Sequence, residues 1–432
     1  MTVWLARVLK TEQHELPALL WAFFYFFCLL CSYYILRPVR DEMGIQGGVD
    51  KLQWLFSATF VGMLIAVPFF GYLSARFPRQ RLILFVYSFF AANLLLFFVL
   101  MQNGVDKVIL ARTFLVWVSV FNLFVISLFW SFMADIFSNA QARRLFGVIA
   151  AGGSAGAIAG PLLTALLVGH IGTHHLLLLS IGLLLLSTLA VARLNTWARI
   201  HGSGKSEARP IGGSIWAGIK LTLNSPYLIG MSIYLLFLTL FATLIYFELM
   251  RLVADQLKDS AARTRLFAQI DLAVNVLTLL VEIFLTNRLI GRFGVALLLM
   301  VLPLLNVVGF GTLVVAPTLV VIVVFQALRR VVEYALARPV REILFTVVSR
   351  EEKYKAKNFI DTVVYRGGDA MSGWLSSFLK GAGVSLALVA SLAIPLALGA
   401  AVVGWYLGKK QEKLKGVADL TPARPITPAR AS

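Results

Sequence analysis

Charged residues are scarce in this chain. Asp, Glu, Lys and Arg make up 14% of its 432 residues and hydrophobic residues 59%, whereas a soluble domain has about 25% charged residues. This composition excludes a set of soluble domains and predicts a polytopic membrane protein. Acidic residues are the scarcer sign, 21 against 39 Lys and Arg, so the net charge is +18. Most basic residues fall in loops predicted for one side, as the positive-inside rule describes, so the charge does not indicate a nucleic-acid partner.

Cysteine and histidine are also scarce, with two and five residues. Cys28 and Cys31 lie inside the first apolar run, where a redox CxxC has no βαβ context, so we interpret them as small packing residues. His170, His174 and His175 have no cysteine or carboxylate nearby in sequence and are interpreted as surface residues. No metal site is therefore expected.

Apolar runs long enough to cross a bilayer recur twelve times. They cover residues 18–40, 52–75, 82–101, 108–137, 145–169, 174–195, 226–250, 266–290, 294–316, 318–346, 359–380 and 384–408. The sequence therefore predicts an all-α membrane protein with twelve transmembrane helices in two six-helix pseudo-repeats. The first run, Leu16 to Leu36, is too long for the core of a cleaved signal peptide.

Polar segments divide the chain into five parts. These are an N-terminal cytoplasmic or interfacial helix (1–17), a first six-span half (18–196), a cytoplasmic linker (197–217), a second half (218–408) and a disordered cytoplasmic tail (409–432). Because the basic loops share the side of the termini, both termini are predicted to be cytoplasmic, in a bacterial inner membrane and in contact with its lipid. The linker's Gly-Lys-Ser at 204–206 lacks the earlier Gly and the strand of a P-loop, so we expect no cofactor and no enzymatic activity.

The tenth span, 318–346, carries six charged residues. They are Arg329, Arg330, Glu333, Arg338, Arg341 and Glu342. A charge at the bilayer centre costs about 2.5–3.5 kcal/mol, so such residues usually face a cavity, although arginines at a helix end can also snorkel to the surface. At i,i+4 spacing Arg329 reaches Glu333, and Arg338 reaches Glu342. Arg330 and Arg341 are then the first candidates to bind an anion, because guanidinium groups match carboxylate and phosphate oxygens.

The end of the first span repeats part of this pattern. Arg37-Pro38-Val39-Arg40 matches Arg338-Pro339-Val340-Arg341, in spans that are predicted to run in opposite directions. We therefore expect the two motifs toward opposite mouths of one pathway, with all four arginines binding the solute. The alternative is a chance recurrence, since cations are favoured at any helix C-terminus.

Carboxylates in the eighth and eleventh spans are candidates for proton coupling. One face of the eighth span carries Asp271, Asn275, Thr278 and Glu282, and one face of the eleventh carries Asp361, Tyr365 and Asp369, beside Arg366. Membrane carboxylates either pair with cations or carry protons. Asp271, Glu282, Asp361 and Asp369 are thus the proton candidates, Arg366 joins the substrate-binding candidates, and interhelical ion pairs are the alternative. In the fifth span, Gly152, Gly156 and Gly160 form a stripe that permits close helix packing.

Three stretches resemble motifs of known transporter families. The two halves echo each other at 137–153 and 348–368, and GYLSARFPRQR at 71–81 looks like the loop between spans two and three of the major facilitator superfamily, whose members duplicate a six-span half. Residues 34–41, YILRPVRD, and 351–368, EEKYKAKNFIDTVVYRGG, are similar to motifs of the ATP/ADP translocase family. In the second motif the matching positions are Lys353, Lys355, Lys357, Ile360, Asp361, Arg366 and Gly368.

The resemblance implies a secondary transporter that works by alternating access and exchanges nucleotides or related phosphorylated anions. A second hypothesis is a proton-coupled carrier of another polar or charged solute. A third, a membrane scaffold or receptor, gives no reason for charge inside the spans.

Overall fold

The computed structural model describes residues 11–12, 14–201 and 215–420, and every regular element in these ranges is a helix. This confirms the predicted all-α class. Most of the N-terminal segment 1–17 and the middle of the linker, 202–214, lie outside the described residues.

The first half consists of six long helices joined by short polar turns. They are α2 (Leu16–Gln46), α3 (Leu52–Arg76), α4 (Arg79–Gln102), α5 (Lys107–Ile136), α6 (Asn139–Ile171) and α7 (Leu176–His201), with a 3₁₀ turn η1 (Val49–Lys51) before α3. Side chains in the turns satisfy the free backbone N–H groups at helix starts. Asp106 accepts hydrogen bonds from the N–H groups of Val108 and Ile109, and Ser138 with Gln141 forms a capping box at α6.

The second half contains more helical pieces. These are α8 (Ile215–Asn224), α9 (Pro226–Gln256), α10 (Ser260–Val281), η2 (Glu282–Thr286), α11 (Asn287–Val315), α12 (Leu319–Val332), η3 (Glu333–Ala337), α13 (Arg338–Leu344), α14 (Arg350–Phe359), η4 (Ile360–Val364), α15 (Tyr365–Gly381) and α16 (Leu386–Leu420). The π-helical turns η2, η3 and η4 continue the α-helices on either side of them, so α10–η2, α12–η3–α13 and α14–η4–α15 are rods. The turn between the eighth and ninth spans is Gly294, whose φ of 72° favours glycine.

Twelve rods therefore match the twelve predicted spans. In the described ranges, nine helices are long and apolar enough to cross a membrane, and one of them, Ser260–Val315, contains the eighth and ninth spans. The other two predicted spans, α12–η3–α13 and α14–η4–α15, are not among these nine. They are the rods that combine a π turn with many charged residues, which is consistent with a polar interior rather than a lipid-facing position.

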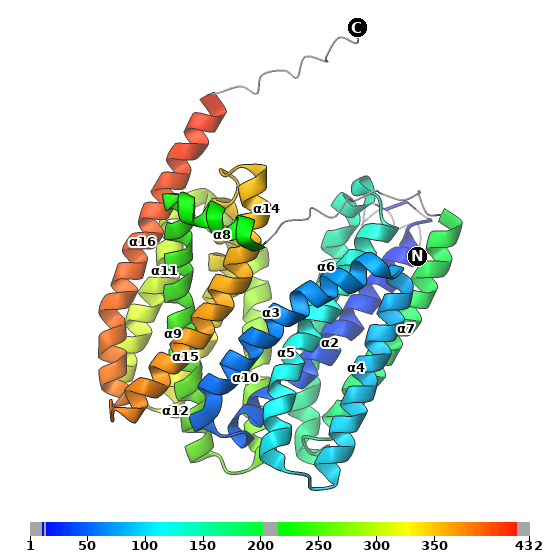
Figure 1. Cartoon of the computed structure of the whole chain (residues 1–432), viewed down its shortest axis with the longest axis horizontal. Helices are drawn as coiled ribbons and strands as arrows, with labels where there is room; N and C mark the ends of the chain where they lie inside the picture. The colour runs from blue at the N-terminus through cyan, green and yellow to red at the C-terminus, as the bar shows by residue number, and fades with distance from the viewer. Residues whose placement is uncertain (1–10, 13, 202–214, 421–432) are drawn as a thin grey trace.

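The twelve rods alternate in direction, so α2 begins and α16 ends at the same end of the bundle, the upper end in Figure 1. We call this the terminal end, and the opposite one the far end. In Figure 1, α4 and α7 lie to one side of the bundle and α11 and α16 to the other. Between the halves, α6 packs on α10 and α3 packs on α15.

The glycine stripe of α6 packs on α2 within the first half. A β-carbon at Gly160 would lie 2.8 Å from the Cys31 carbonyl oxygen, and one at Gly156 would overlap the carbonyl oxygen of Phe27. The stripe thus allows two backbones to approach closely, as predicted. Cys28 and Cys31 are free and buried in α2.

Two helices extend past the boundaries expected from the sequence. The tail was expected to be disordered from residue 409, but α16 continues to Leu420, because Gln411 is buried and Lys409 pairs with Glu412 at 2.9 Å. The linker was expected to begin at 197, but α7 extends to His201, with Trp197 buried in the core of the first half and donating a hydrogen bond to the His14 carbonyl.

Candidate functional site

A wide cavity of about 870 Å³ lies between the halves, toward the terminal end. A narrower chamber of about 210 Å³ lies beyond it, toward the far end. Both are lined by Arg37, Arg40, Tyr334, Tyr365 and Arg366, so the two spaces meet at these five side chains. A cavity of this volume is within the ordinary range of ligand sites, about 300–1,000 Å³.

Contacts between the halves seal the far end. The Arg263 guanidinium pairs with Glu42 at 2.8 Å, and Lys380 pairs with Asp50 at 2.8 Å. The Trp54 ring packs edge-on against the Trp374 ring, with centroids 4.7 Å apart. The wide cavity and this seal together describe a conformation that is open at the terminal end.

The carboxylate of Asp271 lies between two arginines at the centre of the site. Its Oδ1 is 2.6 Å from Arg330 Nη2, and its Oδ2 is 3.5 Å from Arg37 Nε. Asp271 is 1% exposed, and its two partners come from opposite halves, α2 and α12. Arg330, which the sequence left without a partner in its own helix, therefore has one on α10.

Glu333 is a second carboxylate that serves two arginines. Its Oε2 is 2.9 Å from Arg329 Nη2, which confirms the predicted i,i+4 pair, and its Oε1 is 3.4 Å from Arg338 Nη2. The predicted Arg338–Glu342 pair is wrong. The reason is the π turn η3, in which residue i+5 lies over residue i, so that the Arg338 N–H bonds to the Glu333 carbonyl and its side chain turns toward Glu333.

The remaining cavity arginines each have one carboxylate. Arg40 Nη2 is 2.6 Å from Asp41 Oδ1, Arg341 Nη2 is 3.2 Å from Asp361 Oδ1, and Arg366 Nη1 is 3.7 Å from Asp369 Oδ2. Arg341, the other residue expected to lack a partner, thus has one on the eleventh rod. Glu342 instead pairs with Lys357 at 2.5 Å.

Arginines outnumber the carboxylates that neutralise them. Seven arginines line the two spaces: Arg37, Arg40, Arg329, Arg330, Arg338, Arg341 and Arg366. Among the described residues, five carboxylates pair with these arginines: Asp41, Asp271, Glu333, Asp361 and Asp369. Glu282 is an exposed carboxylate on the wall of the wide cavity, where no ion pair joins it to another described residue. The paired cluster therefore carries more positive than negative charge.

The candidate site residues all line the two connected spaces, but one pair of motifs lies elsewhere than expected. Both Arg-Pro-Val-Arg motifs line the same wide cavity, rather than opposite mouths, with Arg37 and Arg40 also reaching the narrow chamber. Among the proton candidates, Asp271 and Asp369 line the narrow chamber, whereas Glu282 and Asp361 line the wide cavity.

Helix α9 contributes two polar side chains to the site that were not predicted from the sequence. Tyr246 donates a hydrogen bond to Asp41 Oδ1 at 3.0 Å, and Thr243 donates one to Asp369 Oδ1 at 3.5 Å. Both side chains line the narrow chamber. With Thr239 they form a polar stripe at helical spacing in an otherwise apolar span, and that spacing is the signal that could have revealed them.

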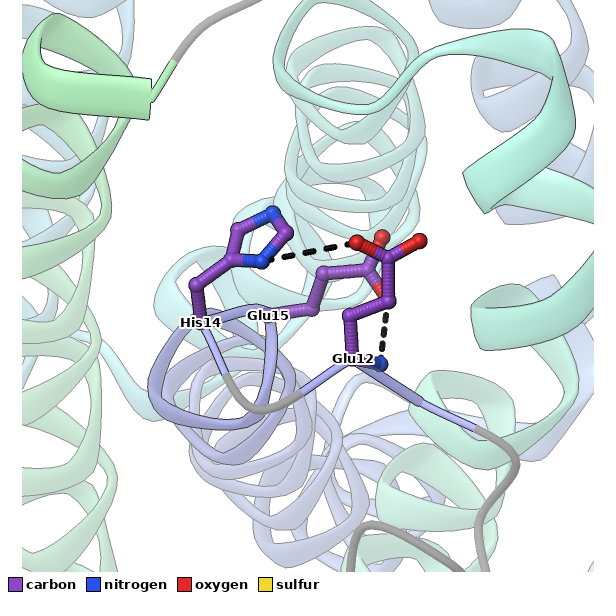
Figure 2. A group of neighbouring side chains, drawn as sticks. All are labelled: Glu12, His14 and Glu15. Atoms are coloured by element: carbon purple, nitrogen blue, oxygen red, sulfur yellow. Dashed lines mark hydrogen bonds and ion pairs between the residues drawn. The ribbon is translucent and has the colours of Figure 1, made fainter.

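A separate cluster of possible metal ligands precedes α2. Figure 2 shows Glu12, His14 and Glu15, with His14 Nδ1 3.5 Å from a Glu12 carboxylate oxygen. Glu15 already has a cation, because its Oε1 is 2.9 Å from Arg144 Nη2. Burial acts to raise the pKa of Glu15, but hydrogen bonds from the Glu12 N–H and Gln141, together with the Arg144 charge, lower it overall. We interpret this cluster as an anchor between the starts of α2 and α6.

Twelve rods in two six-helix halves, around a polar cavity between the halves, define a membrane carrier. The sequence profile of the Major Facilitator Superfamily matches residues 11–337, and the chain belongs to this family. It is therefore a secondary transporter and not an enzyme.

Solved structures show the same fold at low sequence identity. The nucleoside transporter NupG is 13% identical with a TM-score of 0.65, over 93% of this chain and 100% of that one. A bacterial homologue of the iron transporter ferroportin is 13% identical with a TM-score of 0.64, over 92% and 98% of the two chains. A D-xylose–proton symporter is 11% identical with a TM-score of 0.62, over 91% and 98%. No curated protein matches the chain in sequence.

Proposed function

We propose that this transporter works by alternating access and exchanges phosphorylated organic anions, with nucleotides as the leading candidates. The observation that carries the proposal is the arginine-rich cavity, in which Asp271 and Glu333 each serve two guanidinium groups. A guanidinium that shares its carboxylate retains donors for phosphate oxygens. Arg37, Arg40, Arg330, Arg338, Arg341 and Arg366 are the proposed substrate-binding residues.

The resemblance of residues 34–41 and 351–368 to ATP/ADP translocases supports nucleotides within this class. A nucleoside transporter among the structures of the same fold is compatible with such a substrate. The tyrosines 33, 34, 334 and 365 also line the wide cavity, where they offer ring faces to a base.

The proposed orientation puts both termini in the cytoplasm of a bacterium, with the protein in the inner membrane. Basic residues gather at the terminal end, in the loops around Arg79, Arg143 and Arg288 and along the end of α16. The wide cavity then faces the cytoplasm, and anionic lipid headgroups lie beside the basic loops.

Uptake by the purified protein in liposomes tests this proposal. Labelled ATP should enter liposomes that contain ADP, at a rate that does not depend on a proton gradient, and should not enter liposomes that contain no anion. Arg338→Ala should reduce exchange at least about tenfold. A charged hydrogen bond from one guanidinium to the substrate contributes about 1.5–3 kcal/mol, and its loss slows transport accordingly. Arg288→Ala, which changes an exposed arginine outside the cavity, is the matched control. Equal rates for both variants would contradict the proposed site.

A proton-coupled carrier of another polar solute is the second candidate. The observation that favours it is the weak pairing of Asp369, whose oxygens lie 3.7 Å from Arg366 Nη1 and 3.5 Å from Thr243 Oγ1, together with the unpaired Glu282 among the described residues. Asp271 and Asp361 are better neutralised. Uptake of a different solute that follows the proton gradient, and that is lost in Asp369→Asn, would replace the exchange proposal with this one.

A further inference from the structure

The two ion pairs of Asp271 differ in strength. The pair with Arg330 is short, at 2.6 Å, whereas Arg37 Nε lies 3.5 Å from the other carboxylate oxygen. Asp271 Oδ2, Arg37 Nε and Arg330 Nη2 are buried, and none of these atoms makes a hydrogen bond with a described residue. Both arginines are therefore held by charge attraction, and Arg330 is held more strongly because its distance is shorter.

Arg37 is also the more accessible partner. Its side chain is 15% exposed and lines both the wide cavity and the narrow chamber, whereas the side chain of Arg330 is 8% exposed and lines only the chamber. A solute that enters through the wide cavity thus reaches Arg37 first. The Nε atom of Arg37 faces Asp271, so an anionic group that binds Nε as well as the terminal nitrogens has to take the place of the Asp271 carboxylate there.

We infer that Asp271 is a specificity-determining residue, which competes with the anionic group of the solute for Arg37. This inference rests on the proposed anion transport. A monocarboxylate solute exchanges one carboxylate for another at Arg37 and gains little. A phosphate dianion brings more charge and a third oxygen to the same guanidinium, and it displaces Asp271 with a net gain. Asp271 therefore selects phosphate groups over carboxylates.

Binding of two small anions to the purified full-length chain in detergent tests this inference. Titration calorimetry at neutral pH compares inorganic phosphate with acetate. The wild type should prefer phosphate at least tenfold. In Asp271→Asn, Arg37 has no competing carboxylate, so acetate affinity should rise about tenfold and the preference for phosphate should shrink. Asp271→Glu keeps a carboxylate and should keep the preference.

A matched control and a second variant make the result decisive. Asp135→Asn removes the carboxylate of an Arg–Asp pair outside the cavity, with Arg79 at 3.1 Å, and should leave both affinities unchanged. Arg37→Gln retains the Asp271–Arg330 pair, so it should fold even if Asp271→Asn does not, and should lose phosphate affinity at least tenfold. An unchanged preference in Asp271→Asn, or wild-type phosphate affinity in Arg37→Gln, overturns the inference while the transport proposal stands. A wild type that binds neither anion overturns both.

Discussion

The two halves line one cavity with different kinds of helix. The first half contributes regular α-helices, and its cavity charges are Arg37, Arg40 and Asp41. The second half contributes the other five cavity arginines and four of the five paired carboxylates. Within the described residues, π turns occur only in the second half, one in each of the rods α10–η2, α12–η3–α13 and α14–η4–α15.

This difference shows how charges are accommodated in a membrane interior. A π turn shifts the phase of the helix, so side chains five apart come together, and one carboxylate of the second half can serve two arginines. The first half does not need this device, because it carries few charges and packs its helices through a glycine stripe. It forms the less charged wall of the cavity.

The largest effect on stability is expected from Glu333→Gln. It leaves Arg329, which is 3% exposed, without its carboxylate, and removing one partner of a buried pair costs about 3–5 kcal/mol. Glu342→Gln is the matched control in the same rod, because its side chain is 49% exposed and its pair with Lys357 contributes about 0–1 kcal/mol. Thermal unfolding in detergent measures both. Equal losses of stability in the two variants would mean that the ion pairs of Glu333 in η3 are no more important for folding than an exposed pair.

Gly156→Ala tests the wall formed by the first half. The added methyl group would overlap the backbone of α2 at Phe27 and Cys31, and such overpacking costs about 1–3 kcal/mol. A β-carbon at Gly182 in α7 meets nothing within 4 Å, so Gly182→Ala should be neutral or slightly stabilising. Thermal unfolding measures the stability of both variants. An unchanged stability in Gly156→Ala would show that α2 and α6 can move apart to accommodate the added methyl group.

A smaller effect is expected where two π turns meet. The Thr286 hydroxyl in η2 donates a hydrogen bond to the Ala335 carbonyl in η3 at 2.8 Å, and Thr286→Val should cost about 1 kcal/mol. Thr164→Val is the control in a regular helix of the first half, where the buried hydroxyl bonds to Gly160 of the preceding turn. That loss should be smaller, because this backbone oxygen keeps its own helical bond. If Thr286→Val slows exchange and Thr164→Val does not, the contact between the π turns takes part in transport.

The sequence predicted the rods better than the contacts between them. Apolar length located twelve spans, and i,i+4 spacing located the Arg329–Glu333 pair. The partner of Arg330 could not be predicted, because Asp271 lies on another rod. Which carboxylate lies beside Arg330 depends on how the helices pack against each other. Arg338 was paired with Glu342 because a constant 3.6-residue period was assumed, and η3 breaks that period. The six site arginines were chosen for their chemistry, and their common cavity is a property of the assembled halves.

The smallest expected effect concerns a first-half carboxylate outside the cavity. Glu15 pairs with Arg144 before α2 begins, and Glu15→Gln should cost about 0.5 kcal/mol at neutral pH, since the amide keeps part of the hydrogen bonding. The pKa of Glu15 is lowered from 4.5, so its charge stabilises the fold above that pH, and this contribution disappears as the pH falls through the lowered pKa. The difference in unfolding free energy between variant and wild type should therefore be constant from about pH 6 to 8 and vanish in stronger acid. A difference that grows on acidification has the opposite sign and would show that folding raises the pKa of Glu15 rather than lowering it.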